Sequence, residues 1–265
     1  MFGSLETDGH LCGIISSTKP DEIYILSAQS DVRVSFDIPE YTCDVTGMGV
    51  LRLLEAIRNF SPNSKLYQAS SSEMFGATTP PQNESSIMNP QNPYAVAKLF
   101  AYHQCKIYRK AYNMFVSNGI LFNHESERRG LNFVTRKITH TVAEIAKGKQ
   151  DFIHLGNLDA KRDWGYAPEY VEAMWRMLQH KKPDDFVVGT GEVHTVQEFV
   201  DETFKVAGIK NPQKHIIIDT SMMRPSETNY LQANTTKIAT ELDWTPTTFF
   251  HDLVKRMYES DLKSC

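Results

Sequence analysis

The stretch Asn92-Pro93-Tyr94-Ala95-Val96-Ala97-Lys98 decides the fold of this 265-residue chain. It opens a helical pattern that continues to Tyr112. Tyr94 and Lys98 are one helical turn apart, so both side chains can lie on the same helix face. A neighbouring positive charge favours the phenolate. We therefore expect Lys98 to lower the pKa of Tyr94, which could then act as a base near neutral pH.

The segments before this helix strengthen the prediction. Leu66–Ala69 reads as a short strand, and the run Ser70-Ser71-Ser72-Glu73 follows at its end. A loop comes next, and Pro93 stands where it can open the helix. A Tyr-x-x-x-Lys spacing alone is weak, since most such pairs lie on exposed helix faces. Strand, serine, loop and helix in this order predict a site that oxidises an alcohol with a nicotinamide.

Strand-like and helical patterns alternate through the first half, which predicts a parallel sheet with crossover helices. We expect α/β architecture: an incomplete Rossmann-type parallel sheet with a smaller α/β substrate-binding domain. The predicted domains are 1–124 and 125–265, with 164–180 packing back on the first. The expected strands are 22–26, 65–69 and 115–122, and the expected helices are 47–59, 94–112, 133–147, 168–180 and 195–207.

Composition narrows the class of protein. A net charge of −4 gives no basic field for nucleic acid, and 41% apolar residues can form a full core. No apolar run reaches a membrane-spanning length, and no signal pattern opens the chain. The four cysteines show no Cys-x-x-Cys spacing, and no metal-ligand motif is present. We expect a reduced, metal-free cytoplasmic protein that binds neither nucleic acid nor membrane.

Five runs carry a family resemblance, and they stand in the family's order. The chain resembles the extended short-chain dehydrogenases/reductases, and within them the GDP-mannose 4,6-dehydratase family. The resemblance extends from about Leu5 almost to the end of the chain, and it implies a place in nucleotide-sugar metabolism, toward GDP-fucose. The runs are Tyr67–Gly76, Asn118–Ser126, Asn132–Lys137, Gly156–Gly165 and Arg224–Glu227.

The resemblance implies the catalytic residues Ser71, Glu73, Tyr94 and Lys98. It also implies a lyase reaction: oxidation at C4 of GDP-mannose, removal of the C5 proton by Glu73, loss of water from C6, and return of the hydride to C6. Glu73 can share one side of the backbone with Ser71, two residues earlier. A solvated loop carboxylate is the alternative for this residue. An epimerase or a simple reductase needs no such glutamate.

For the cofactor, the resemblance implies NADP. Three positions depart from the family: Ser27 replaces Gly, Asp31 replaces His and Glu127 replaces Pro. The first narrows the space beside the cofactor, the second adds negative charge, and the third affects the placement of Arg129. Tyr41 could equally be a half-buried core tyrosine. The implied cofactor contacts are Leu26, Ser27, Ala28, Gln29, Ser30, Tyr41, Lys98, His124 and Arg129.

The implied partner is GDP-mannose, in a homo-oligomer that is a dimer or tetramer if intact. Arg162 and Arg224 come from distant segments, as a clamp on two phosphates requires, although either alone could be a surface arginine. Glu227 could accept hydrogen bonds from ribose hydroxyls. The implied substrate contacts are Asn123, Asn132, Val134, Lys137, Lys161, Arg162, Arg224 and Glu227.

A Gly-rich turn after the first strand normally holds the dinucleotide pyrophosphate. The sequence shows none near its start, because Gly47-Met48-Gly49 lacks the third glycine and Gly189-Thr190-Gly191 comes too late. We therefore expect the chain to join the family pattern after its first two strands and to be a poor dehydratase. The alternatives are a truncated, weakly active or inactive paralogue that only binds sugar nucleotide, and an NAD-dependent sugar-nucleotide epimerase.

Overall fold

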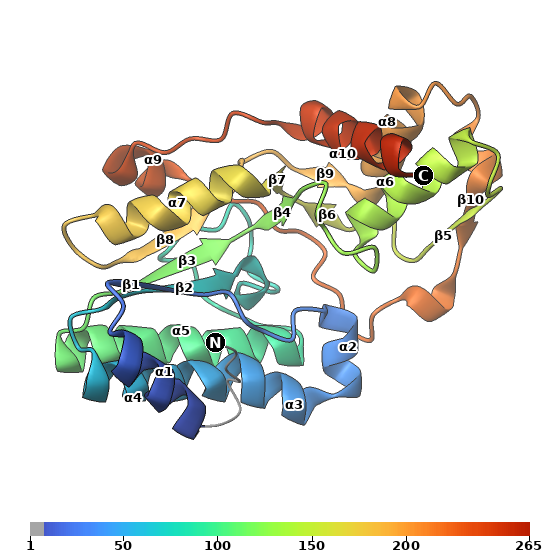
Figure 1. The fold of residues 1–265 in the computed structure, drawn as a ribbon. Coiled ribbons are helices and arrows are strands. Elements are labelled where there is room, and N and C mark those ends of the chain that lie inside the picture. The colour runs from blue at the N-terminus through green and yellow to red at the C-terminus, as the bar shows by residue number, and fades with distance from the viewer. Residues whose placement is uncertain (1–7) are drawn as a thin grey trace.

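The centre of the molecule is a four-stranded sheet in which all neighbouring strands run parallel (Figure 1). The structure is a computed structural model that describes residues 8–265. The predicted α/β class with a parallel sheet is confirmed. The strands, in spatial order, are β1 (Glu22–Ile25), β2 (Lys65–Ser71), β3 (Val116–Leu121) and β8 (Asp185–Val188).

Helices cover both faces of this sheet, as the crossover rule predicts. In Figure 1, α1 (Asp8–Thr18), α4 (Gly49–Phe60) and α5 (Pro93–Tyr112) lie below the sheet and α7 (Ala167–Gln179) lies above it. The stripe predicted for α4 is buried, since Val50, Leu53, Leu54 and Ile57 point into the core. Such periodic apolar residues fix the face that a helix turns toward its sheet.

The connection from β1 to α4 is mostly helical after the non-helical segment Leu26–Asp31. It contains α2 (Val32–Asp37), α3 (Pro39–Cys43) and a π-helix at Asp44–Met48 that leads directly into α4. The α-helix was predicted to begin at Gly47. The chain is instead π-helical as far as Met48, and α4 begins two residues later than predicted, at Gly49. The π-helical turn packs closely on α5: a Cβ on Gly47 would lie 3.3 Å from the Phe100 ring.

The second half forms its own core around α6 (Val134–Ala146), α8 (Val196–Val206) and α10 (Phe250–Ser264). Two single 3-10 turns, Pro212–His215 and Thr220–Met222, lie in the later loops. Three short strand pairs hold this part together: β4 (Asn123–Glu125) with β7 (Trp164–Tyr166), β5 (Ile153–Leu155) with β10 (Ile216–Ile218), and β6 (Lys161–Arg162) with β9 (His194–Thr195).

Three elements of the second half return to the first sheet. One is α7, which falls within the segment predicted to pack back. The others are β8, which pairs with β3, and α9 (Thr236–Leu242), which packs near β8. Neither β8 nor α9 was predicted, because elements of four and seven residues rarely show a clear period. The division of the chain at residue 124 stays a prediction.

Candidate active site

Ser71, Tyr94 and Lys98 meet where β2 ends against the first turns of α5. The Ser71 hydroxyl is close enough to the Tyr94 phenol to lower its pKa, and the Lys98 ammonium lies 5.8 Å from the centre of the Tyr94 ring. The same ammonium donates to the Ala69 carbonyl at 2.6 Å. An ammonium has three N–H donors, so Lys98 keeps two for other partners. The structure therefore brings these three predicted residues together.

Burial controls protonation at this site more than neighbouring charge does. It raises the pKa of Tyr94 to about 12, although the Ser71 hydrogen bond lowers it. Burial also lowers the pKa of Lys98 to about 8. Desolvation penalises the charged form of either group. The prediction that Lys98 brings the Tyr94 pKa near neutrality is therefore wrong for this structure.

Glu73 lies in the 3-10 turn Ser72–Met74, and its carboxylate is enclosed. The residue is only 9% exposed, so the alternative of a solvated loop carboxylate is wrong. Its Oε2 accepts hydrogen bonds from Asn92 Nδ2 at 2.9 Å and from Thr228 Oγ1 at 3.4 Å. Its Oε1 lies 3.9 Å from an Arg162 nitrogen. The negative charge of Glu73 also acts on Tyr94, so the two groups are electrostatic neighbours.

Replacing Lys98 with Met should change how stability depends on pH. The folded pKa is about 8 against an ordinary 10.5, so between these values the unfolded chain binds more protons than the folded one. The free energy of unfolding of the wild-type chain should therefore rise with pH across this window, relative to the variant, by at most about 3 kcal/mol. Urea unfolding of both proteins at the two ends of the window measures the difference, and parallel pH dependences would contradict it.

The family model for GDP-mannose 4,6 dehydratase matches residues 2–257. GDP-mannose 4,6 dehydratase 1 of Arabidopsis thaliana is 49% identical, over 99% of this chain and 73% of its own length. The chain belongs to the GDP-mannose 4,6-dehydratase family. The human member of the family is 47% identical, over 99% of this chain and 76% of its own length.

Solved structures agree with this membership at the level of the fold. The structure of RMD from Pseudomonas aeruginosa complexed with NADPH has a TM-score of 0.90 at 22% identity, covering 100% of this chain and 89% of that one. UDP-glucose 4-epimerase of Thermotoga maritima with UDP-glucose has a TM-score of 0.89 at 20% identity, covering 99% and 84%. Dehydratase, reductase and epimerase chemistry can share a fold, so the residues of the site must separate them.

In this dehydratase-family chain, the segment Leu26–Ser30 leaves the carboxyl end of β1, where parallel sheets bind their ligands. Its Leu26 is 56% exposed. Gln29 is held by the helical connection: its N–H donates to Thr46 Oγ1 at 3.1 Å, and its side-chain oxygen accepts from Thr42 Oγ1 at 3.2 Å. Tyr41 lies on α3 and is 50% exposed, and it belongs to none of the hydrophobic core clusters of the described residues.

His124 stacks on Tyr170 with ring centres 4.9 Å apart, and its Nδ1 lies 2.9 Å from the Phe122 carbonyl. Burial lowers the pKa of His124 to about 4, so the ring is neutral near pH 7. A neutral ring that donates from Nδ1 leaves Nε2 as an acceptor.

Arg129 is bound within its own loop. Its Nε lies 3.2 Å from a Glu125 carboxylate oxygen, and its guanidinium covers the Phe133 ring at 3.6 Å. Glu127, the residue that departs from the family's proline, lies 3.9 Å from an Arg256 nitrogen. The structure therefore gives Arg129 a protein partner and turns the Glu127 charge toward α10.

Asp31, another departure from the family, caps a helix. Its Oδ1 accepts from the N–H groups of Arg33 and Val34 at the start of α2. Its Oδ2 accepts from the side chain of Asn132 at 3.2 Å. Much of its charge is thus satisfied by the protein, and one predicted substrate residue is bound to it.

The two predicted phosphate-binding arginines converge on one carboxylate. A guanidinium nitrogen of Arg162 lies 2.8 Å from Glu227 Oε1, and a guanidinium nitrogen of Arg224 lies 3.0 Å from the same oxygen. The side chain of Arg162 is 8% exposed and that of Arg224 is 31% exposed. Distant segments thus form a compact cationic pair, as predicted, whereas the predicted use of Glu227 for ribose hydroxyls stays a prediction.

The remaining predicted substrate residues lie on separate elements. Asn123 begins β4, and its carbonyl accepts from Tyr170 at 3.5 Å, while Val134 begins α6. The Lys161 ammonium lies 5.3 Å from the centre of the Tyr230 ring, and the Lys137 ammonium lies 3.3 Å from the Met222 sulfur.

Two buried site residues were not predicted: Asn92 and Thr228. An Asn before a Pro that opens a helix is a recognisable N-cap signal, and it could have identified Asn92. Thr228 has no signal of its own beyond its place after Glu227.

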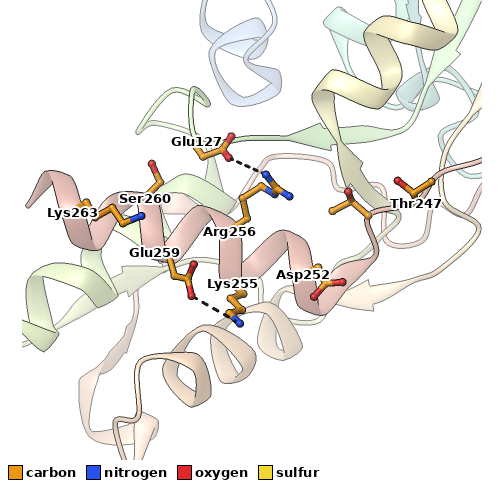
Figure 2. A pocket seen from close by; sticks show the side chains of 9 residues that line it. Glu127, Thr247, Asp252, Lys255, Arg256, Glu259, Ser260 and Lys263 are labelled. Atoms are coloured by element: carbon orange, nitrogen blue, oxygen red, sulfur yellow. Dashed lines mark ion pairs between the residues drawn. The ribbon is translucent and has the colours of Figure 1, made fainter.

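The hollow drawn in Figure 2 lies along α10, and none of the predicted site residues lines it. Its walls carry the ion pairs Arg256–Glu127 at 3.9 Å and Lys255–Glu259 at 4.0 Å. Exposed pairs of this kind contribute roughly 0–1 kcal/mol. We place the chemistry instead at the carboxyl ends of the parallel strands, where Ser71, Glu73, Tyr94 and Lys98 lie. Among helices of residues 8–265, none is long and apolar enough to cross a membrane.

Proposed function

We propose that this chain converts GDP-mannose to GDP-4-keto-6-deoxymannose, with net loss of water. The enclosed Glu73 carboxylate carries the proposal. Oxidation of an alcohol needs only a base such as Tyr94, whereas elimination across C5 and C6 needs a second acid/base group. Glu73 supplies that group next to Ser71 and Tyr94, and family membership supports the same reaction.

The chain's residues would act in sequence. The phenolate of Tyr94, stabilised by Ser71 and by the positive charge of Lys98, takes the proton of the C4 hydroxyl. The resulting 4-keto group acidifies C5–H, and Glu73 removes that proton. Water leaves from C6 with a proton from Ser71 or Glu73. NADP, when bound, would accept the C4 hydride and return it to C6, and its cationic oxidised ring would favour the phenolate. As the hydride returns to C6, C5 takes up a proton, which balances the proton that Tyr94 took from the C4 hydroxyl.

The polar side chains at the carboxyl ends of the parallel strands fit the nicotinamide and ribose half of such a cofactor. Lys98 keeps two donors, neutral His124 offers an acceptor, and Tyr41 is half exposed. Leu26 adds apolar surface where β1 ends. We assign NADP rather than NAD from the family resemblance, and the Pseudomonas RMD that shares the fold was a complex with NADPH.

The arginine pair would hold the diphosphate of GDP-mannose. Two phosphates suit planar guanidinium donors, which can bind in a bidentate way. Glu227 would orient both guanidiniums until the substrate enters. We also propose a cytoplasmic homo-oligomer, in keeping with the predicted dimer or tetramer.

Replacing Arg224 with Ala should weaken GDP-mannose binding by about tenfold or more, because a hydrogen bond to a charged group contributes roughly 1.5–3 kcal/mol. Arg224 is the more exposed member of the pair, so its loss should disturb folding less than that of Arg162. Calorimetry would give the affinity, with Arg256→Ala on α10 as the control (Figure 2). Equal affinities for the wild-type chain and Arg224→Ala would refute the clamp.

Turnover tests the function as a whole. The purified chain with GDP-mannose and NADP⁺ should form the 4-keto-6-deoxy product without net production of NADPH. Formation of a C4 epimer with no loss of water would instead identify an epimerase.

A further inference from the structure

Asn92 bonds both to Glu73 and to the start of the helix that carries Tyr94. Its Oδ1 accepts from the Ala95 N–H at 2.8 Å and caps α5. Its Nδ2 donates to Glu73 Oε2 at 2.9 Å. The residue is 5% exposed, so water does not replace these bonds readily. One planar amide therefore fixes the position of Glu73 relative to the first turn of α5.

The partners determine which way the amide points. A flipped amide would place its NH₂ group against the Ala95 N–H and its oxygen against the Glu73 carboxylate, and both contacts are repulsive. The bond to Asn92 is also the shortest that the Glu73 carboxylate makes, since Thr228 lies at 3.4 Å and Arg162 at 3.9 Å. Asn92 thus restrains Glu73 more directly than its other neighbours do.

We propose that Asn92 is the positioning residue for Glu73. It fixes the position of the Glu73 carboxylate relative to Tyr94, so that one bound sugar can place C4 next to Tyr94 and C5 next to Glu73. This role rests on the proposed function. Asn92 itself exchanges no proton with the substrate. A misplacement of about 1 Å can cost about 10²-fold in rate, so the restraint is large enough to matter.

Two substitutions separate this role from helix capping. Ser and Asp both cap helices well, but Ser is too short to reach Glu73 and Asp has no donor for it. Asn92→Ser should lower kcat by about 10- to 100-fold while KM and the melting temperature stay near wild type. Asn92→Asp should lower kcat further, because two carboxylates then face each other. Asn92→Ala, which also loses the cap, should show a lower melting temperature as well.

Kinetic isotope effects identify the reaction step that Asn92→Ser slows. With GDP-mannose deuterated at C5, the isotope effect on kcat should rise in Asn92→Ser, because removal of the C5 proton becomes slower. With deuterium at C4, the isotope effect should not rise. A purely structural role predicts instead that kcat, KM and melting temperature worsen together, with unchanged isotope effects.

The outcomes distinguish the positioning role of Asn92 from the proposed dehydratase function on which that role rests. An active wild-type chain whose Asn92→Ser variant keeps full kcat would overturn the positioning role alone. A wild-type chain without dehydratase activity, or a fully active Glu73→Gln variant, would overturn the proposed function and the positioning role with it.

Discussion

Glu73→Gln is expected to stop the reaction after oxidation at C4. Gln has nearly the same shape, and its side-chain oxygen can still accept from Asn92, so the fold should hold. It cannot take the C5 proton. The expected loss in kcat is about 10²- to 10⁴-fold, the usual contribution of a positioned acid or base. Bound cofactor should therefore accumulate in its reduced form, which single-turnover absorbance measures.

A matched control is Glu172→Gln, which removes an exposed carboxylate on α7 that pairs with Arg176 at 2.6 Å. It should leave kcat unchanged. If Glu73→Gln formed the 4-keto-6-deoxy product at the wild-type rate, Glu73 would not be the C5 base.

Tyr94→Phe is expected to block the first step instead. The change removes only the hydroxyl whose pKa Ser71 lowers, so the ring can keep its place beside Lys98. The loss in kcat should again be about 10²- to 10⁴-fold, while affinity for GDP-mannose stays close to wild type. Unlike Glu73→Gln, this variant should accumulate no reduced cofactor, because the hydride never leaves C4.

Tyr112→Phe is the control on the same helix, since Tyr112 ends α5 and is 50% exposed. It should keep full activity. Reduced cofactor appearing at the wild-type rate in Tyr94→Phe would show that another group takes the C4 hydroxyl proton.

The sequence predicted five of the longer helices, α4 to α8, whose patterns are long or whose ends are marked, but it missed α1 and the 15-residue α10. Pro93 marks the start of α5, and the apolar stripe of α4 fixes its buried face. β8 and α9 are too short to carry such patterns, and they take their places through contacts with β3 and α7. The sheet order was therefore only partly predictable.

At the site, residue identities were predictable and their environment was not. The burial that raises the pKa of Tyr94 depends on the surrounding tertiary structure, so the local Tyr-x-x-x-Lys spacing suggested the opposite shift. The Thr228 hydroxyl that reaches Glu73 lies 155 positions away along the chain. Only the fold determines which distant side chains enclose a carboxylate.

The most direct test of the account follows one deuterium atom. The purified chain, with NADP⁺, is given GDP-mannose that carries deuterium at C4, and the product is analysed by NMR and mass spectrometry. Internal oxidation by Tyr94 and elimination by Glu73 predict GDP-4-keto-6-deoxymannose with the deuterium at C6. Deuterium back at C4 of a sugar that has lost no water, or a deoxy product without deuterium at C6, would contradict the account.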